Sequence, residues 1–241
     1  MRFGIISDIH GNVIALNKAL EEFEKRNIDK IIFCGDAIGI GPEPEKVVKK
    51  LIEYKDKIYG VRGNHEQYLL VAIPETVHDE KRPISEIEIE FHKWTHNQLS
   101  EISKKYLETL PIFQSIEIEG KKIYVTHYPY NQETGEYKDH IVNPSTSECV
   151  EMFSEIDADV FLFGHTHKAV VNRKDDRLYI NPGSLGCPAG TNKALCGILN
   201  IEKEKMDYEE LYLDYDLQKE RKIIKELKYP NYEYMLESFF K

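Results

Sequence analysis

Five short apolar runs, rich in β-branched residues, mark the first two thirds of the chain. Runs of this length and composition are typical of buried strands. They cover residues 2–7, 30–34, 58–62, 121–126 and 159–163. Apolar residues recur at helical spacing between the first three runs, with Asn12 ahead of one helix and Pro44 opening the other. The first sixty residues therefore predict the order β-α-β-α-β.

The middle of the chain has a different pattern. Residues from about 67 to 111 show no strand pattern and predict a helical insertion with two helices, the capping box Thr95-x-x-Gln98 lying near their junction. Further on, Ser145-x-x-Glu148 has the capping-box pattern that starts a helix.

Strand patterns dominate again after residue 163. Four runs suggest a second sheet packed on the first; they span residues 169–173, 177–180, 194–201 and 206–214. Residues from about 216 to 241 predict a helical extension that is broken at Pro230. We interpret the whole of 1–241 as a single domain with an insertion and an extension.

Polar residues follow each of the five apolar runs. They are Asp8 and His10, Asp36, Asn64 and His65, His127, and His165 and His167. Ligands of α/β proteins gather at the carboxyl ends of strands, so these side chains are expected to lie together. Oxygen and imidazole ligands drawn from several strands can hold a pair of divalent ions, and such pairs catalyse phosphoryl transfer.

Composition narrows the function classes. The chain has 32 basic and 42 acidic residues, and this net charge of −10 argues against stable nucleic-acid binding. No secretory leader or membrane-spanning run is apparent, which predicts a cytoplasmic protein without membrane association. Its scattered cysteines read as reduced packing residues; they are Cys34, Cys149, Cys187 and Cys196.

Taken in order, the five polar islands resemble the calcineurin-like metallophosphoesterase superfamily. Three further segments resemble its bacterial and archaeal predicted phosphodiesterase branch; they are Ser7–Asn12, Gly39-x-Gly41-Pro42 and Asn181–Ser184. The resemblance runs from residue 2 to about 201. It implies a metallo-dependent phosphatase-like fold, a four-layer α/β/β/α sandwich of two mixed sheets with helices outside.

The resemblance also implies a ligand set for two divalent ions. One ion would be held by Asp8, His10, Asp36 and His167, and the other by Asp36, Asn64, His127 and His165. A bridging role suits Asp36, because a carboxylate has two oxygens and partly cancels the repulsion between ions. Manganese is favoured, with iron, zinc, nickel or cobalt as alternatives, because mixed imidazole and oxygen ligands suit all of them.

The catalytic residue implied by the resemblance is His65, a general acid that protonates the leaving group after a hydroxide activated by both metals attacks phosphorus. Asn64, His65 and Tyr128 are the candidate substrate-binding residues, Tyr128 because it starts a loop over 128–144 that could form a lid. In related protein Ser/Thr phosphatases an Asp-Arg pair follows the Gly-Asp island. Gly39 and Ile40 stand there in this chain.

Other polar residues have simpler interpretations. Glu66 and Asn12 are expected to cap helices. His92 and His96 have the i, i+4 spacing of zinc ligands, but the Glu of a zincin base is missing, so a solvated face or one packed on Trp94 is preferred. His78 and His140 have no evident partners in sequence.

We therefore expect a dinuclear phosphoesterase acting on a small phosphodiester or nucleotide, including dinucleoside polyphosphates. Alternatives are a phosphomonoesterase, including a protein Ser/Thr phosphatase, and a nuclease, against which the acidic charge counts. An alternative of another class is a non-catalytic metal-binding scaffold. The sequence leaves the substrate and native metal open, and a homo-oligomer is compatible with the apolar Phe239-Phe240 end.

Overall fold

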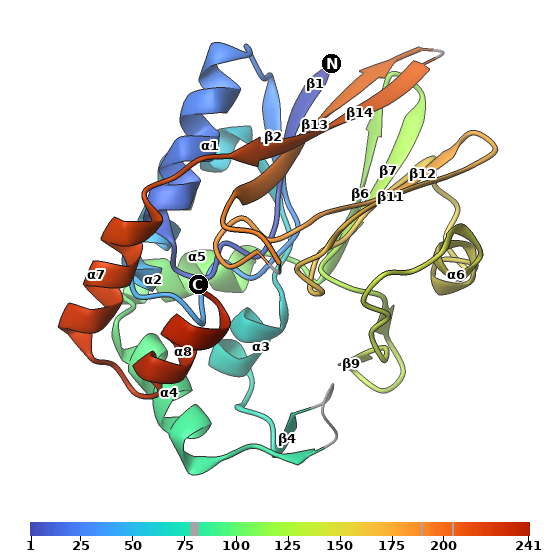
Figure 1. Cartoon of the computed structure of the whole chain (residues 1–241). Coiled ribbons are helices and arrows are strands. Elements are labelled where there is room, and N and C mark those ends of the chain that lie inside the picture. The colour runs from blue at the N-terminus through green and yellow to red at the C-terminus, as the bar shows by residue number, and fades with distance from the viewer. Residues whose placement is uncertain (78–81, 189, 204) are drawn as a thin grey trace.

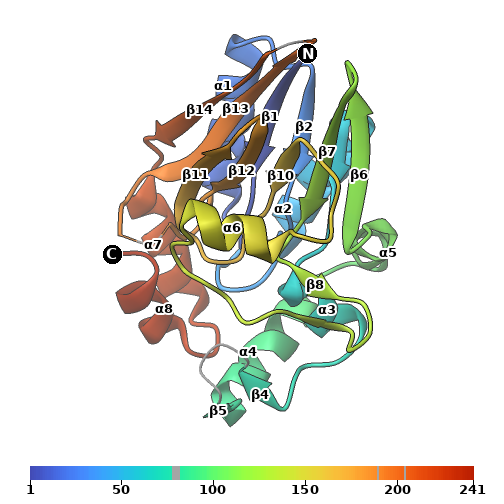
Figure 2. The same cartoon turned by 90° about the vertical axis from the view of Figure 1, so that its right-hand side faces the viewer.

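The computed structural model describes residues 1–77, 82–188, 190–203 and 205–241 (Figure 1). Within these residues two five-stranded mixed sheets face each other (Figures 1 and 2). His78 lies outside the described residues. No helix in the described part of the chain is long and apolar enough to cross a lipid bilayer.

The first sheet has the strand order β14-β13-β1-β2-β3, with β1, β2 and β3 parallel and β13 and β14 antiparallel to their neighbours. Its strands are β1 (Arg2–Ile6), β2 (Lys30–Phe33), β3 (Ile58–Gly60), β13 (Ala194–Glu202) and β14 (Lys205–Leu213). The second sheet has the order β11-β12-β10-β7-β6, with β7, β10 and β12 parallel. Its strands are β6 (Phe113–Ile118), β7 (Lys121–Thr126), β10 (Val160–Leu162), β11 (Ala169–Lys174) and β12 (Arg177–Pro182).

The strands after residue 163 divide between the sheets, which differs from the sequence prediction. β11 and β12 extend the second sheet, but β13 returns to the first and pairs with β1, Phe3 opposite Leu199. Nearly every residue of β13 is buried, which suits a strand inside a sheet with both faces covered. Alternation of apolar residues defines the faces of a strand but not its neighbours.

Alternating side chains of β1 show how the layers are built. Phe3 and Ile5 pack between the two sheets, whereas Ile6 packs against the outer helices of the first sheet. Those helices are α1 (Val13–Lys25) and α2 (Pro44–Glu53), and α6 (Thr146–Met152) covers the second sheet (Figure 2). The four-layer α/β/β/α sandwich is therefore confirmed.

Helix starts follow the predicted chemistry at two places. The Asn12 side chain accepts a hydrogen bond from the backbone N–H of Ala15, and Ser145 forms a capping box with Glu148. The predicted Thr95-x-x-Gln98 box is wrong. Thr95 is a buried residue within a helix whose own capping box lies at Ser85 and Glu88, and Ser100 caps the next helix.

The described residues between 64 and 109 form three helices, where the sequence predicted two, and a short hairpin that the sequence pattern did not reveal. These elements are α3 (Asn64–Leu70), β4 (Thr76–Val77), β5 (Arg82–Pro83), α4 (Glu86–Asn97) and α5 (Glu101–Thr109), after a 3₁₀ turn (Lys55–Lys57). A second small hairpin occupies the predicted lid; its strands are β8 (Tyr130–Asn131) and β9 (Glu136–Tyr137).

The C-terminal residues form two helices on either side of Pro230, as predicted. α7 (Leu217–Leu227) and α8 (Tyr232–Ser238) pack beside α4 (Figure 1). Tyr229 between them stacks on Trp94, with ring centroids 4.8 Å apart, and its hydroxyl donates to the carbonyl of Ile40 at 2.8 Å. Met235 and Phe240 are buried. The C-terminal helices thus close one side of the edge where the parallel strands end.

Candidate metal centre

All seven side chains that the sequence predicts as ligands converge at one edge of the sandwich. Asp8 follows β1, Asp36 follows β2, His127 follows β7, and Asn64 opens α3. The carboxyl ends of the parallel strands of both sheets meet at this edge, which explains how residues far apart in sequence come together.

Four of these side chains form a first group of potential ligand atoms. His10 Nε2 lies 3.0 Å from His167 Nε2, 3.7 Å from Asp8 Oδ1 and 3.8 Å from Asp36 Oδ2. His167 Nε2 is in turn 3.4 Å from Asp8 Oδ1. Ligand atoms that share one ion at roughly 2.1 Å lie roughly 3.0–3.4 Å from one another. The two distances from His167 Nε2 fall in this range, and the two from His10 Nε2 to the carboxylates exceed it by 0.3 and 0.4 Å.

A second group lies on the other side of Asp36. His127 Nε2 is 3.3 Å from Asp36 Oδ2 and 3.0 Å from Asn64 Oδ1. His165 Nδ1 is 3.1 Å from Asn64 Oδ1 and 3.3 Å from His127 Nε2. These separations also match atoms that share one ion.

Asp36 is the residue that both groups share, and one of its oxygens belongs to both. Oδ2 faces His10 and His127, whereas Oδ1 accepts a hydrogen bond from the backbone N–H of His65 at 3.0 Å. The backbone contact fixes the rotation of the carboxylate. Its free oxygen is therefore directed between the two groups.

Backbone carbonyls set the tautomers of two ligands. Nδ1 of His10 lies 3.0 Å from the carbonyl of Ile38, and Nδ1 of His127 lies 2.8 Å from that of Cys34. A carbonyl only accepts, so each Nδ1 carries a proton and each Nε2 is the nitrogen that faces the other ligand atoms. Burial by itself lowers the pKa of His127, but the charge of Asp36 outweighs burial and raises that pKa to about 9, so the ring is charged at neutral pH.

Electrostatics also favours cations at this edge. Burial by itself raises the pKa of the Asp8 carboxyl, but hydrogen bonds with His10 and His167 outweigh burial and hold that pKa well below its usual range. Burial acts on Asp36 in the same way, and the charge of His127 outweighs it, so the pKa of Asp36 is also lowered. Two buried carboxylates thus stay ionised, and ions near them would be strongly attracted.

The backbone at the ligands is unusual. Five non-glycine ligands have positive φ: Asp8, His10, Asp36, His165 and His167. His165 and His167 do not lie on a strand, because β10 ends at Leu162 and both residues belong to the turn that follows. Their ring nitrogens nevertheless belong to the two groups of ligand atoms, His167 to the first and His165 to the second. Strained backbone of this kind is common where ligands must be aimed by the surrounding structure.

Glu66 does more than the helix capping that the sequence suggested. Its fully buried carboxylate accepts from the backbone N–H groups of Gly63 at 2.7 Å, Asp36 at 2.9 Å and Ile38 at 3.2 Å. It therefore links the loop after β2 to the start of α3. Burial, aided by the nearby Asp36 charge, raises the pKa of Glu66 to about 7.

His65 lies against the first group, and His10, Asp36 and His65 each offer a potential ligand atom within 4.8 Å of the other two. Its ring centroid is 5.0 Å from that of His10, and its Nδ1 has no hydrogen-bond partner among the described residues. Burial holds the pKa of His65 well below the usual value. A histidine beside ligand atoms can exchange a proton with a bound substrate, and because Nδ1 is buried, Nε2 is the nitrogen left for this role.

The interpretation of His92 as part of a solvated or Trp94-packed face is wrong. His92 is 8% exposed, and its ring lies 5.4 Å from that of His65 and 5.2 Å from that of Tyr68. The cause is the packing of α4 on α3, which helical periodicity alone does not reveal. Trp94 turns away to stack on Tyr229. Burial lowers the pKa of His92 to about 4, so a neutral ring supports His65.

Tyr128 lies behind the ligands rather than in the open site. It is fully buried, its hydroxyl accepts from the backbone N–H of Ile141 at 2.7 Å, and its ring lies 5.3 Å from that of His165. Tyr137 covers the other side of His165, stacked at 6.4 Å, and His140 meets the same ring at 5.6 Å. Sequence reasoning identified the loop but not which of its aromatic residues faces the site.

The cysteines are buried and form no disulfides with one another, in keeping with packing roles. Cys187 has a further contact: its Sγ forms a hydrogen bond with Nδ1 of His167, and the two atoms are 3.5 Å apart. Ser184 Oγ lies 3.6 Å from the same sulfur. Cys187 therefore contacts the ring nitrogen of His167 opposite the Nε2 that faces His10, and its sulfur also lies within 4.8 Å of potential ligand atoms of both histidines.

Comparisons of the sequence with known proteins point to one family, and a solved structure shares the fold. Residues 1–204 match the sequence model of the calcineurin-like phosphoesterase superfamily domain. The chain is 29% identical over 239 residues to uncharacterized protein MJ0912 of Methanocaldococcus jannaschii, covering 92% of this chain and 91% of that protein. It is 27% identical over 214 residues to phosphodiesterase MJ0936 of the same organism, covering 89% and 100%. Hypothetical protein PH1004 from Pyrococcus horikoshii has the same fold, with a TM-score of 0.82 at 21% identity, covering 100% of this chain and 98% of that one.

Proposed function

The chain belongs to the calcineurin-like phosphoesterase superfamily, and we propose that it hydrolyses a small phosphodiester or nucleotide at a dinuclear metal centre. The observation that carries the proposal is the shared oxygen of Asp36. Oδ2 lies 3.8 Å from His10 Nε2 in one group of ligand atoms and 3.3 Å from His127 Nε2 in the other. One carboxylate between two groups suits a pair of ions better than a single one.

The proposed ligands follow the two groups. Asp8, His10, Asp36 and His167 would hold one divalent ion, and Asp36, Asn64, His127 and His165 the other. When bound, the pair would polarise the phosphoryl oxygens and make a water molecule acidic enough to supply hydroxide at neutral pH. Manganese is our first choice, with iron, zinc, nickel and cobalt as alternatives that the ligand types also suit.

The chain's own residues then position and protonate the substrate. Asn64 offers its side chain to the second group, and its neighbour His65 lines a cavity that opens on both groups of ligand atoms, so both residues lie where a bound phosphoester would sit. We assign His65 the role of general acid toward the leaving oxygen. An anionic phosphoester would raise the pKa of the buried ring and favour its protonation. Tyr128 is fully buried, so we assign it support of His165 in place of substrate contact.

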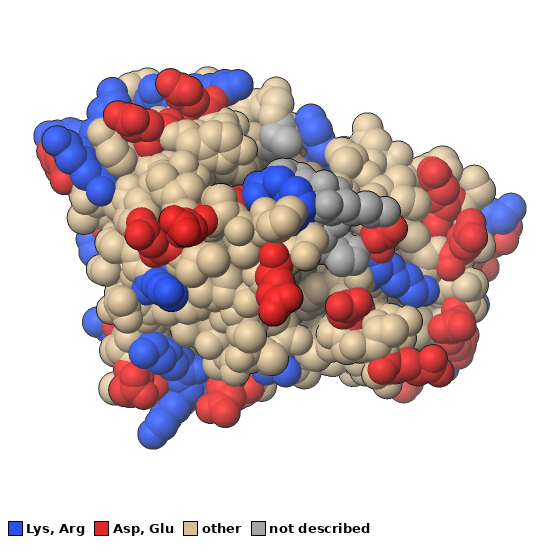
Figure 3. All heavy atoms as spheres, turned by 90° about the horizontal axis from the view of Figure 1, so that it is seen from below, with Lys and Arg blue, Asp and Glu red and all other residues tan. Residues whose placement is uncertain are grey.

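A small diester is favoured over a protein substrate or a nucleic acid. Phosphodiesterase MJ0936 is similar over its full length. Gly39 and Ile40 occupy the positions where protein phosphatases carry their Asp-Arg pair. On the face seen from below, the visible Lys and Arg side chains are interspersed with Asp and Glu (Figure 3). A long polyanion would need a more extended basic surface.

Hydrolysis of bis-p-nitrophenyl phosphate and p-nitrophenyl phosphate, with manganese and after chelation, tests this proposal. We expect metal-dependent hydrolysis of both, with a higher kcat/KM for the diester. A preference for the monoester would favour the phosphomonoesterase alternative. Bound metal without activity on either ester would favour the non-catalytic scaffold.

A further inference from the structure

Two cavities open on the candidate metal centre from different sides. The first, here the helix cavity, has a volume of about 580 Å³ and lies among α3, α4 and α8. Apart from the histidines of the metal centre and His65, its aromatic lining residues are Tyr68, Phe91, His92, Tyr234 and Phe239. The second, here the hairpin cavity, has a volume of about 620 Å³ and is lined by Tyr68, Tyr130 and Tyr137 among others.

The two cavities meet at the metal centre. Asn64 and His165 line both, and so does Tyr68, which stands between them. A phosphorus atom beside these residues would have one cavity on each side. Each volume suits an organic group of the size of a nucleoside, since small-molecule sites commonly occupy roughly 300–1,000 Å³.

Aromatic rings in each cavity are arranged to contact a flat group. In the hairpin cavity, Tyr130 meets Tyr137 edge to face with centroids 5.2 Å apart, and the Tyr137 hydroxyl donates to the carbonyl of Arg62 at 3.1 Å. In the helix cavity, Tyr234 meets Phe239 edge to face at 6.2 Å. Rings fixed in this way provide faces on which a heterocycle can stack, whichever heterocycle it is.

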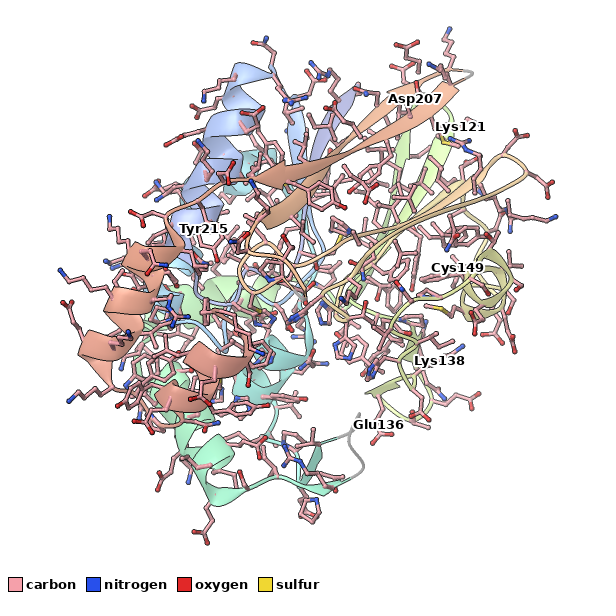
Figure 4. All side chains as sticks on the ribbon, viewed as in Figure 1. Lys121, Glu136, Lys138, Cys149, Asp207 and Tyr215 are labelled. Atoms are coloured by element: carbon pink, nitrogen blue, oxygen red, sulfur yellow. The ribbon has the colours of Figure 1, made fainter. Side chains whose placement is uncertain are left out.

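The charges of the lining do not favour a polyphosphate chain. Among the described residues that line the helix cavity, the one Lys or Arg residue is Arg82. Its guanidinium donates two hydrogen bonds to the carboxylate of Glu88, at 2.8 and 2.6 Å. The described charged residues that line the hairpin cavity are Glu75, Glu136 and Lys138, the last two carried by the hairpin region (Figure 4). Among the described lining residues, neither cavity has the excess of positive charge that additional phosphates would need, so organic groups fit these walls better.

We propose that the substrate is a phosphodiester with an aromatic or heterocyclic group on each side of a single phosphorus, one group in each cavity. This inference rests on the proposed function. His65 lines the helix cavity and is not among the described residues that line the hairpin cavity, so the helix cavity holds the leaving group. Water adds to phosphorus and releases a proton to solvent, the P–O bond to that group breaks, and its oxygen takes a proton from His65. The monoester product keeps the group in the hairpin cavity.

Two diesters with the same leaving group test the inference. Bis-p-nitrophenyl phosphate fills both cavities, whereas methyl p-nitrophenyl phosphate leaves the hairpin cavity without an aromatic group. We expect Tyr130→Ala to lower kcat/KM about tenfold for the first ester and much less for the second, and Tyr130→Phe to retain the ring and the wild-type ratio. Tyr234→Ala should lower both alike, because p-nitrophenolate leaves through the helix cavity in each case.

The matched control is Tyr212→Ala, which removes a tyrosine that is 54% exposed on β14, away from both cavities. It should leave the ratio between the two diesters unchanged. An equal effect of Tyr130→Ala on both diesters, or no effect on either, would overturn the inference while leaving phosphodiesterase activity intact. Absence of hydrolysis of either diester by the manganese-loaded wild type would instead overturn the proposed function, and the inference with it.

Discussion

Gly39 lies directly against the ring of His65. A Cβ atom at position 39 would lie 2.2 Å from Nδ1 of His65, far inside the distance that two atoms can occupy. Gly39 also has a φ of +87°, a conformation that other residues rarely adopt. The residue that replaces the phosphatase Asp therefore has a positive role: its missing side chain makes the space in which the His65 ring stands.

Gly39→Ala should displace the His65 ring and lower kcat for diester hydrolysis by about 10²-fold, because small misplacements of catalytic groups have effects of that size. Metal content should stay at the wild-type value. Gly120→Ala is the matched control: Gly120 has a φ of +76° but nothing within 4 Å of an added Cβ. It imposes similar backbone strain and should keep full activity; equal losses in both variants would remove the proposed role of Gly39.

His65→Ala should reduce kcat by about 10²- to 10⁴-fold, the range typical of a general acid. The loss should be larger for a diester with an alkyl leaving group than for one that releases p-nitrophenolate, because the poorer leaving group depends more on protonation. Metal content, measured by elemental analysis, should change less than turnover. Loss of both ions in this variant would show that His65 is a ligand and not the acid.

Glu66→Gln should lower the unfolding free energy of the metal-free protein by about 1–3 kcal/mol in a denaturant titration. Three backbone N–H groups donate to the two carboxylate oxygens of Glu66, and the amide of glutamine offers them only one acceptor oxygen. The exposed Glu101, on α5, provides the comparison: Glu101→Gln should change the unfolding free energy by less than about 0.5 kcal/mol. A Glu66→Gln protein as stable as the wild type would mean that these hydrogen bonds contribute little.

Glu220 predicts a pH dependence of stability away from the metal centre. Burial, with a smaller contribution from Glu43, raises the pKa of Glu220 to about 8, and neither carboxylate oxygen has a hydrogen-bond partner among the described residues. The folded-state pKa exceeds the unfolded value of roughly 4.3. Protonated Glu220 therefore gives full stability below about pH 4, which is lost as the pH rises to about 8.

Glu220→Gln removes this titration. Compared with the wild type, it should change the unfolding free energy little at pH 4 and raise it by about 3–5 kcal/mol at pH 9. Glu226→Gln, an exposed substitution on the same helix, should show no such trend. Thermal unfolding of the three proteins at both pH values measures the difference, and parallel behaviour of the two variants would contradict the raised pKa of Glu220.

The strand positions and the convergence of Asp8, Asp36 and His127 could be predicted because each follows a short apolar run, and parallel strands end at one edge. The placement of β13 and β14 could not, because their alternation fits either sheet. The positive φ of Asp36 and His165 was also hidden: apart from glycine, residue type says little about left-handed backbone.

The walls of the site were less predictable than its ligands. His92 looked solvated because helical spacing does not tell which neighbour a helix packs against, and its contact with His65 depends on the angle between α3 and α4. Tyr128, next to His127 in sequence, turned out to be buried, whereas Tyr137, ten residues from His127, faces the ligands. Such contacts depend on how loops close, which local patterns do not encode.

Anomalous scattering from crystals grown with manganese tests the central claim most directly. We predict two manganese peaks, about 3.5–4 Å apart, with Oδ2 of Asp36 between them. One peak should be surrounded by Asp8, His10 and His167, and the other by Asn64, His127 and His165. A single peak, or no manganese near Asp36 at saturating concentration, would contradict a dinuclear centre bridged by this carboxylate.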